Sequence, residues 1–156
     1  MNDEYIYSLL MKKLTENIAI MQNYKVEKTN KKTNDKVGLY YTSYDVILYS
    51  KVLNRKVSIG MVDYYDHKVV DIILYKVLSY DEHIDGSIYM NLYLTKHLKL
   101  DNDNKIMYLS NNIGETLDMK LQDFFVRFLS VVDDLFFEIL EGKAWIEIPF
   151  DWGPYK

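Results

Sequence analysis

Histidine and carboxylate side chains are the groups with which this chain could do acid–base or metal chemistry. The histidines are His67, His83 and His97. The segment DEHID, residues 81–85, places three carboxylates around His83, and such a group could hold a metal ion. Because no second segment supplies ligands in a recognisable spacing, we expect a solvated loop here instead of a metal site. The segment DNDNK, residues 101–105, begins like a calcium loop, but Ile106 stands where that loop needs glycine.

Nucleophilic catalysis needs a serine, threonine or cysteine that a neighbouring base activates. The chain has no cysteine and no G-x-S-x-G sequence, and its 6 glycines form no phosphate-binding pattern. Paired acids such as Asp63 and Asp66 could act in a pocket, but their spacing indicates no particular reaction. We therefore expect that the protein is not an enzyme, and that it has no cofactor and no metal site.

Two carboxylates, Asp133 and Asp134, interrupt the apolar run FFVRFLSVVDDLFFEIL of residues 124–140. The spacing predicts one continuous helix from near Thr116 to Gly142, since glycine favours the position just after a helix. At about 100° per residue, Asp134 lies on the polar stripe of this helix and Asp133 on the shoulder of its apolar arc. Asp133 then either pairs with a lysine or a tyrosine hydroxyl of the same domain, or belongs to a surface that recognises a partner.

The second interpretation gives a candidate binding surface that combines acids with aromatic side chains. Acids near the C-terminal end of a helix oppose the helix dipole, and a local rule that is broken without local gain often marks function. Aromatic residues would anchor a partner protein, and carboxylates would steer a basic one. The candidate partner-binding residues are Asp133, Asp134, Phe137, Glu138, Glu141, Trp152 and Tyr155.

The N-terminal part of the chain is expected to contain a helix and then a loop. Apolar residues at three- and four-residue steps predict a helix over residues 3–22, capped by Asn2 or Asp3. The next segment, KVEKTNKKTNDK of residues 25–36, has one apolar residue and five lysines, and therefore buries too little surface to order itself. We expect a flexible basic loop. Because it contains no aromatic residue for stacking, we do not expect it to bind nucleic acid.

Alternating apolar and polar residues then predict a series of strands, and a nearly continuous apolar run at residues 69–78 predicts a central strand covered on both faces. They lie at residues 40–49, 57–61, 69–78, 88–95 and 106–109, with an edge strand at 145–150 and a tail at 151–156. Short turns between the strands favour a mainly antiparallel meander. The predicted fold class is α+β: a five- to six-stranded, mainly antiparallel sheet that carries the N-terminal helix and the long C-terminal helix on one face.

Length and composition narrow the class of protein. With 156 residues, 49% of them hydrophobic, the chain suits a single globular domain over residues 1–156. A net charge of −4 argues against a general binder of nucleic acid or of membrane surfaces, and no apolar run reaches the roughly 18 residues that span a bilayer. We recognise no signal peptide, and the absence of cysteine fits a reducing compartment, which leads us to expect the cytoplasm.

The leading hypothesis is a small acidic protein that neutralises a basic partner protein, in the manner of an immunity protein, an antitoxin or a phage-type inhibitor. It rests on small size, acidity, the missing catalytic set, the 15 tyrosines, and a composition typical of AT-rich mobile genes. The alternative is a small-ligand-binding domain or an enzyme with a tyrosine-lined pocket between sheet and helix. A third possibility is a structural protein that self-associates through an exposed strand edge.

Overall fold

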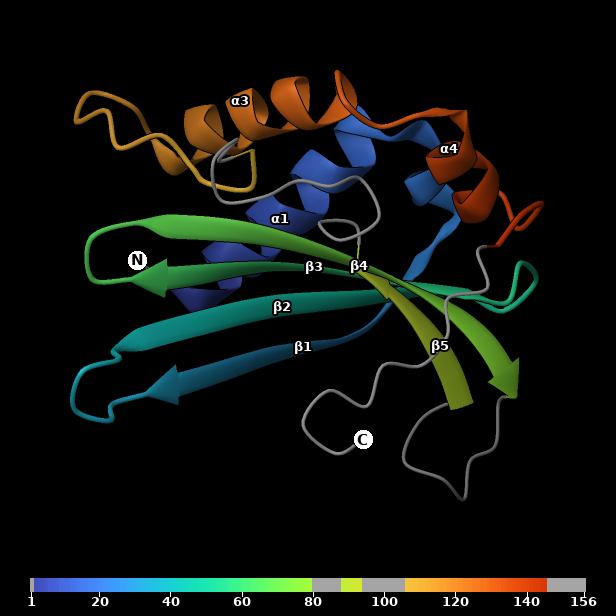
Figure 1. Cartoon of the computed structure of the whole chain (residues 1–156), viewed down its shortest axis with the longest axis horizontal. Coiled ribbons are helices and arrows are strands. Elements are labelled where there is room, and N and C mark those ends of the chain that lie inside the picture. The colour runs from blue at the N-terminus through green and yellow to red at the C-terminus, as the bar shows by residue number, and fades with distance from the viewer. Residues whose placement is uncertain (1, 80–87, 94–105, 146–156) are drawn as a thin grey trace.

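The chain folds as an α+β arrangement in which helices cover one face of an antiparallel sheet (Figure 1). The computed structural model describes residues 2–79, 88–93 and 106–145. The helices are α1 (Asp3–Asn17), a short 3-10 helix (Ala19–Asn23), α3 (Leu117–Leu129) and α4 (Asp134–Leu140). The strands are β1 (Lys25–Asn34), β2 (Tyr41–Ser50), β3 (Arg55–Tyr64), β4 (Lys68–Ser79) and β5 (Ile88–Tyr93). Among the described residues no helix has the length and apolar character that crossing a bilayer requires.

The sheet is a meander in which each strand pairs with its neighbour in sequence. Its order is β1-β2-β3-β4-β5, and every adjacent pair is antiparallel. Four long strands, β1 to β4, make the main sheet, and the shorter β5 pairs with β4. The predicted antiparallel sheet is therefore confirmed, and β2, β3 and β4 lie where strands were predicted, with ends that differ by a few residues. β4, which was predicted to be covered on both faces, buries Val70, Ile72 and Leu74 on one face, whereas side chains on its other face, such as Ile73, are only partly buried.

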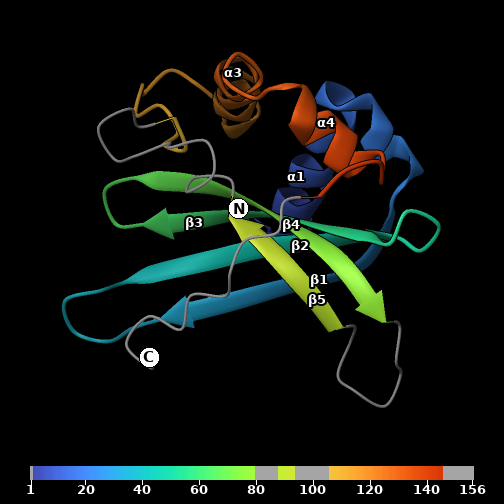
Figure 2. The same cartoon turned by 45° about the vertical axis from the view of Figure 1, so that its right-hand side comes forward.

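The hydrophobic core lies between the sheet and the helices. Figures 1 and 2 show α1, α3 and α4 on the same side of the sheet. Three aromatic side chains of α3, Phe124, Phe125 and Phe128, are fully buried, and their rings contact one another. The alternation within the strands turns the apolar side chains toward this layer, as with Ile59 of β3 and its register partner Ile72 of β4. Burial of these side chains is the main force that holds helices to sheet.

The N-terminal helix starts where the sequence predicts and ends earlier. The Asn2 side chain caps α1 by accepting a hydrogen bond from the backbone N–H of Glu4 at 2.8 Å. The backbone is extended at Ile18, and there α1 gives way to the 3-10 helix. The apolar stripe continues into the 3-10 helix, where Met21 is fully buried, and this continuity explains why the spacing predicted one longer helix.

The segment of residues 25–36, expected as a flexible basic loop, is mostly strand β1, and that prediction is wrong. Nearly all side chains of β1 are exposed, so the sequence carries no apolar alternation there. Its order comes instead from the backbone ladder to β2. Two ion pairs add to the ladder: Lys31 to Asp3 at 3.1 Å, and Glu27 to Lys56 at 2.8 Å.

The predicted continuous helix of residues 116–142 is also wrong, because it is broken into α3 and α4. The start of α3 agrees with the prediction, and the Thr116 side chain caps it by accepting a hydrogen bond from the N–H of Met119 at 3.2 Å. The backbone becomes extended at Asp133, whose carboxylate accepts from the N–H of Phe136 at 3.3 Å and caps α4. An aspartate that bonds a backbone N–H three residues ahead favours a new helix start over continuation of the old helix. Gly142 has φ +76°, the left-handed conformation predicted for the residue after the helix.

Two further strand predictions have different outcomes. Residues 106–109 do not form a strand: Tyr108 makes an isolated bridge to Val69, and the N–H of Val70 donates to the Met107 carbonyl at 2.8 Å. The segment is therefore tied to β4 at single points. The predicted edge strand at 145–150 and tail at 151–156 lie, from residue 146 on, outside the described residues. The segments DEHID and DNDNK, with His83 and His97, lie outside them as well.

Candidate binding surfaces

The acidic residues predicted as a binding surface come together on and beside α4. Asp134 and Glu138 are exposed, and they are four residues apart, so they lie on the same side of the helix. Glu141 is half-buried and forms an ion pair with Lys143 at 2.7 Å, a hydrogen bond that raises the pKa of the Lys143 ammonium. Trp152 and Tyr155, the predicted aromatic partners of these acids, lie outside the described residues.

The structure replaces both interpretations of Asp133 with a third. Within the described part of the chain its carboxylate bonds a backbone N–H and no lysine or tyrosine. Because the chain breaks before α4, Asp133 and Asp134 also lie at the N-terminal end of a helix, where the dipole favours carboxylates. The predicted conflict with the helix dipole therefore disappears for these two acids, whereas Glu138 and Glu141 remain at the C-terminal end of α4.

Phe137 is less available than the sequence suggested. Its side chain is half-buried and packs against the core, with its ring 5.2 Å from that of Phe136 in an edge-to-face contact. The described part of the α4 surface is thus acidic with one partly covered aromatic ring. It suits electrostatic steering better than anchoring of a partner.

A second surface, which combines aromatic and acidic side chains, lies at the end of the sheet where the β1–β2 loop meets the β3–β4 turn. The register pairs Tyr41 with Tyr64, and their rings lie 5.7 Å apart. Tyr64 stacks on His67 at 4.6 Å, and His67 stacks on Tyr108 at 5.3 Å. This row of rings is fixed by strand pairing and by the attachment of Tyr108 to β4.

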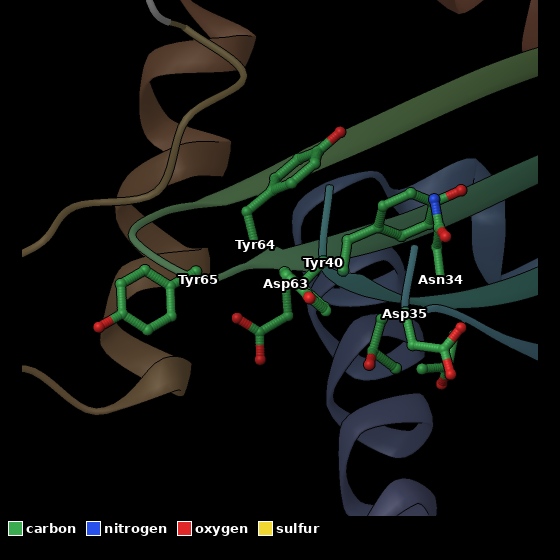
Figure 3. Close-up of a pocket in the computed structure, with 9 residues that line it drawn as sticks. Asn34, Asp35, Tyr40, Asp63, Tyr64 and Tyr65 are labelled. Atoms are coloured by element: carbon green, nitrogen blue, oxygen red, sulfur yellow. The ribbon is translucent and has the colours of Figure 1, made fainter. Parts of the chain in front are cut away.

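A hollow of about 380 Å³ opens beside this row of rings (Figure 3). We call it the tyrosine hollow; its lining residues are Thr33, Asn34, Asp35, Tyr40, Tyr41, Thr42, Asp63, Tyr64 and Tyr65. It is lined by tyrosines, as the alternative hypothesis expected of a pocket, but it lies at the hairpin ends and not between sheet and helices. Figure 3 shows Asp63 between Tyr65 on one side and Tyr40, Asn34 and Asp35 on the other.

Exposed side chains with large apolar area line the tyrosine hollow or lie on the β1–β2 loop that contributes to its lining. Tyr65 is 97% exposed and Tyr40 is 55% exposed. In the β1–β2 loop, Val37 is 95% exposed, and Leu39 is exposed as well. Large apolar side chains gathered on neighbouring loops are typical of an interaction surface, since exposure gives them no role in folding.

His67 and the acids beside it make separate contacts. The Nδ1 atom of His67 lies 2.7 Å from Asp66 Oδ1, and this hydrogen bond lowers the pKa of the Asp66 carboxyl. Asp63 pairs instead with Lys68 at 3.4 Å, so the two acids suggested as a catalytic pair have different partners. In the described ranges, no three histidine or carboxylate side chains stand close enough to hold a metal ion.

The structure also reveals a carboxylate pair that the sequence analysis missed. Asp45 of β2 and Asp71 of β4 are both register partners of Gly60, on the face of the sheet away from the helices. A Cβ atom on Gly60 would collide with the Asp45 carboxylate, so glycine makes room for it. Burial raises the pKa of both carboxyls, and the charge of Asp71 raises that of Asp45 further. The sequence signal for this pair is a glycine within an alternating strand, together with an aspartate near the middle of the strand before it and of the strand after it.

Comparison with family models, with curated protein sequences and with solved structures gives no match. The function is therefore argued from the surfaces described above.

Proposed function

We propose that this is a small acidic protein that binds and neutralises a basic partner protein in the cytoplasm, in the manner of immunity proteins, antitoxins or phage-encoded inhibitors. The observation that carries the proposal is the surface at the hairpin end, where exposed aromatic and apolar side chains surround acids. The net charge of −4 agrees with a basic partner, because long-range attraction raises association rates between oppositely charged proteins.

The hairpin end has the composition of an interface centre. Tyrosine combines a large apolar area with a polar tip, and it is enriched where proteins bind one another. Tyr40 and Tyr65 supply such area from two different loops, and Asp35 and Asp63 lie beside them. This surface supports partner binding better than the α4 surface does.

The α4 acids have a second role in this proposal. Asp134 and Glu138 form no hydrogen bond or ion pair through their side chains within the described residues, so their charge is available to steer a basic protein. Figure 1 shows α4 and the two hairpin loops at opposite ends of the sheet. The contributions of the two surfaces can therefore be tested separately.

The test is affinity purification from the native host with three forms of the protein. One double variant, Tyr40→Ala with Tyr65→Ala, changes the hairpin end. The other, Asp134→Lys with Glu138→Lys, changes α4 and spares the capping residue Asp133. Each variant must melt like the wild type.

We expect the wild type to retain a basic protein in stoichiometric amount, the hairpin variant to lose it, and the α4 variant to retain less of it at low salt, with a weaker dependence on salt than the wild type shows, because two attractive charges are removed. Failure of the wild type to retain any protein would contradict the proposal.

A second candidate function, in acid–base chemistry or small-ligand binding, is favoured by the pair Asp45 and Asp71. Carboxyls with raised pKa values are suited to proton transfer near neutral pH. This second function can be tested without knowing the substrate. A small molecule that copurifies with the wild type and is lost in an Asp45→Asn variant would support it. Copurification of a protein without any such molecule would favour the leading proposal.

A further inference from the structure

We propose that the tyrosine hollow receives a lysine or arginine side chain of the partner protein. This inference rests on the proposed function, because it names the group on the basic partner that the hairpin end would recognise. It concerns one anchor side chain inside a larger contact surface.

The charge of the lining selects a cation. The residues that line the hollow include two carboxylates, Asp35 and Asp63, and no lysine, arginine or histidine. Lys68 pairs with Asp63 through one oxygen at 3.4 Å, which is long for such a contact, so the Asp63 carboxylate keeps capacity for a second cation. An anionic group would be repelled by both acids.

The rings of the lining select a cation that can also stack. Four tyrosines contribute to the wall, and the face of an aromatic ring attracts an ammonium or a guanidinium group. Tyr64 is held between Tyr41 and His67 by ring contacts, so this part of the wall is in place before a partner binds. A preformed wall lowers the ordering cost of binding.

The size and surroundings of the hollow indicate a side chain of a protein. Its volume of about 380 Å³ lies near the lower end of the range of roughly 300 to 1,000 Å³ for ligand sites, which suits one long side chain. The exposed Val37 and Leu39 lie on the same loop, outside the lining. A free small cation would leave them in water, whereas a protein that inserts one side chain would also cover them.

The decisive measurement is a titration of the ¹⁵N-labelled protein, followed by NMR, with N-acetylarginine N-methylamide. The matched control ligand is the citrulline analogue, which has nearly the same shape and no charge. We expect saturable shifts of the amides of Asp35, Tyr40 and Tyr65 with arginine, and at least tenfold weaker binding of citrulline.

Matched variants assign the roles of acid and ring. The Asp35→Asn, Asp63→Asn variant should weaken arginine binding at least fivefold, because it removes charge with little change of shape. Tyr65→Ala should weaken binding, whereas Tyr65→Phe should preserve it, since the ring face remains. Tyr5→Ala, at an exposed tyrosine on α1, should leave the titration unchanged.

The outcomes separate this inference from the proposed function. Equal binding of arginine and citrulline, or arginine shifts centred on α4, would overturn the inference. If the host protein is still retained by the Asp35→Asn, Asp63→Asn variant, the inference fails while the proposed function stands. If arginine binds the hollow but the wild type retains no protein, the hollow binds a free cation. In that case the claim that the cation belongs to a partner protein fails, and the proposed function fails with it.

Discussion

Arg55 and Arg127 each tie together chain segments that no regular ladder of hydrogen bonds joins. Arg55 donates to the carbonyls of Ile139 at 2.9 Å and Ala144 at 2.8 Å, which fastens the end of α4 to β3. Arg127 donates to the carbonyls of Ile106 and Tyr108, each at 2.9 Å. In a chain whose other basic residues are lysines, arginine stands at two places where a rigid fork of donors is used.

We predict that Arg55→Lys and Arg127→Lys each lower the free energy of unfolding by about 1–3 kcal/mol, because lysine leaves a carbonyl without its donor. Urea denaturation measures the change. Lys12→Arg, on the exposed side of α1, is the matched control and should change stability by less than about 0.5 kcal/mol. If the lysine variants were as stable as the wild type, the hydrogen bonds from these two arginines to backbone carbonyls would not contribute to stability.

The carboxylate of Asp71 should destabilise the folded protein at neutral pH. Burial raises its pKa above the ordinary value of 3.8, so the folded state holds the proton more tightly than the unfolded state does. The penalty is absent below the ordinary value and grows as pH rises through the folded value. We therefore predict that Asp71→Asn raises the free energy of unfolding at pH 7.5, and that the gain shrinks toward pH 4.

Asp118→Asn provides the control of opposite sign. Its hydrogen bond with Lys13 lowers the pKa of the Asp118 carboxyl, and Lys13 is only 6% exposed. The stability that this bond contributes is present above pH 3.8 and is lost as pH falls through the folded value. Asp118→Asn should therefore destabilise at pH 7.5 and converge on the wild type in acid. If Asp71→Asn also lowered the free energy of unfolding at pH 7.5, the proposed cost of burying the Asp71 carboxylate beside Asp45 would be contradicted.

At the scale of elements, the break between α3 and α4 makes Asp133 a structural residue. We predict that Asp133→Ala lowers the free energy of unfolding by about 1 kcal/mol, since it removes the cap of α4. Asp133→Ser, which can still cap, should recover most of the loss, and Asp134→Ala should have little effect. If Asp133→Ala stabilised the protein and increased helix content by circular dichroism, the continuous helix predicted from the sequence would be favoured instead.

Strand β1 is an edge of the sheet formed by the described residues, and it carries several exposed lysines. Lysine on an edge strand discourages pairing with another chain. We predict that Lys28→Val with Lys32→Val produces concentration-dependent dimers or aggregates, detected by size-exclusion chromatography with light scattering. The control variant, Lys12→Val with Lys120→Val, removes the same charge from helices. It should leave the oligomeric state measured by light scattering unchanged. Equal association of both double variants would show that lost charge, and not the strand edge, is the cause.

The sequence predicted those elements whose apolar pattern matches their structure. In β2, buried and partly exposed side chains alternate, and in β3 the buried apolar residues Val57, Ile59 and Met61 alternate with polar or small residues, so both strands could be read directly from the sequence. β4 could be predicted from its nearly continuous apolar run. β1 could not be predicted, because its order comes from backbone pairing while its side chains stay exposed. The helix break was missed because the apolar spacing continues across it: Phe128 and Phe136 are both buried, and their rings lie 5.5 Å apart.

At the scale of the whole molecule, the meander determines which loops meet. Antiparallel order brings the β1–β2 loop and the β3–β4 turn to the same end of the sheet, and the β2–β3 turn to the other (Figure 1). Tyr40 and Tyr65 are 25 positions apart in the sequence, and only the register of β2 on β3 makes them neighbours in one lining. The sequence could therefore indicate tyrosine-rich surfaces and an acidic helix, but not the hollow.

Photo-crosslinking in the native host tests partner binding at the hairpin end most directly. The protein would carry p-benzoylphenylalanine at position 65 in one form and at position 5, on the exposed side of α1, in the other. We predict that position 65 crosslinks to one basic protein and that position 5 does not. Absence of any crosslink from position 65, or the same products from both positions, would contradict the proposal that the hairpin end binds a basic partner.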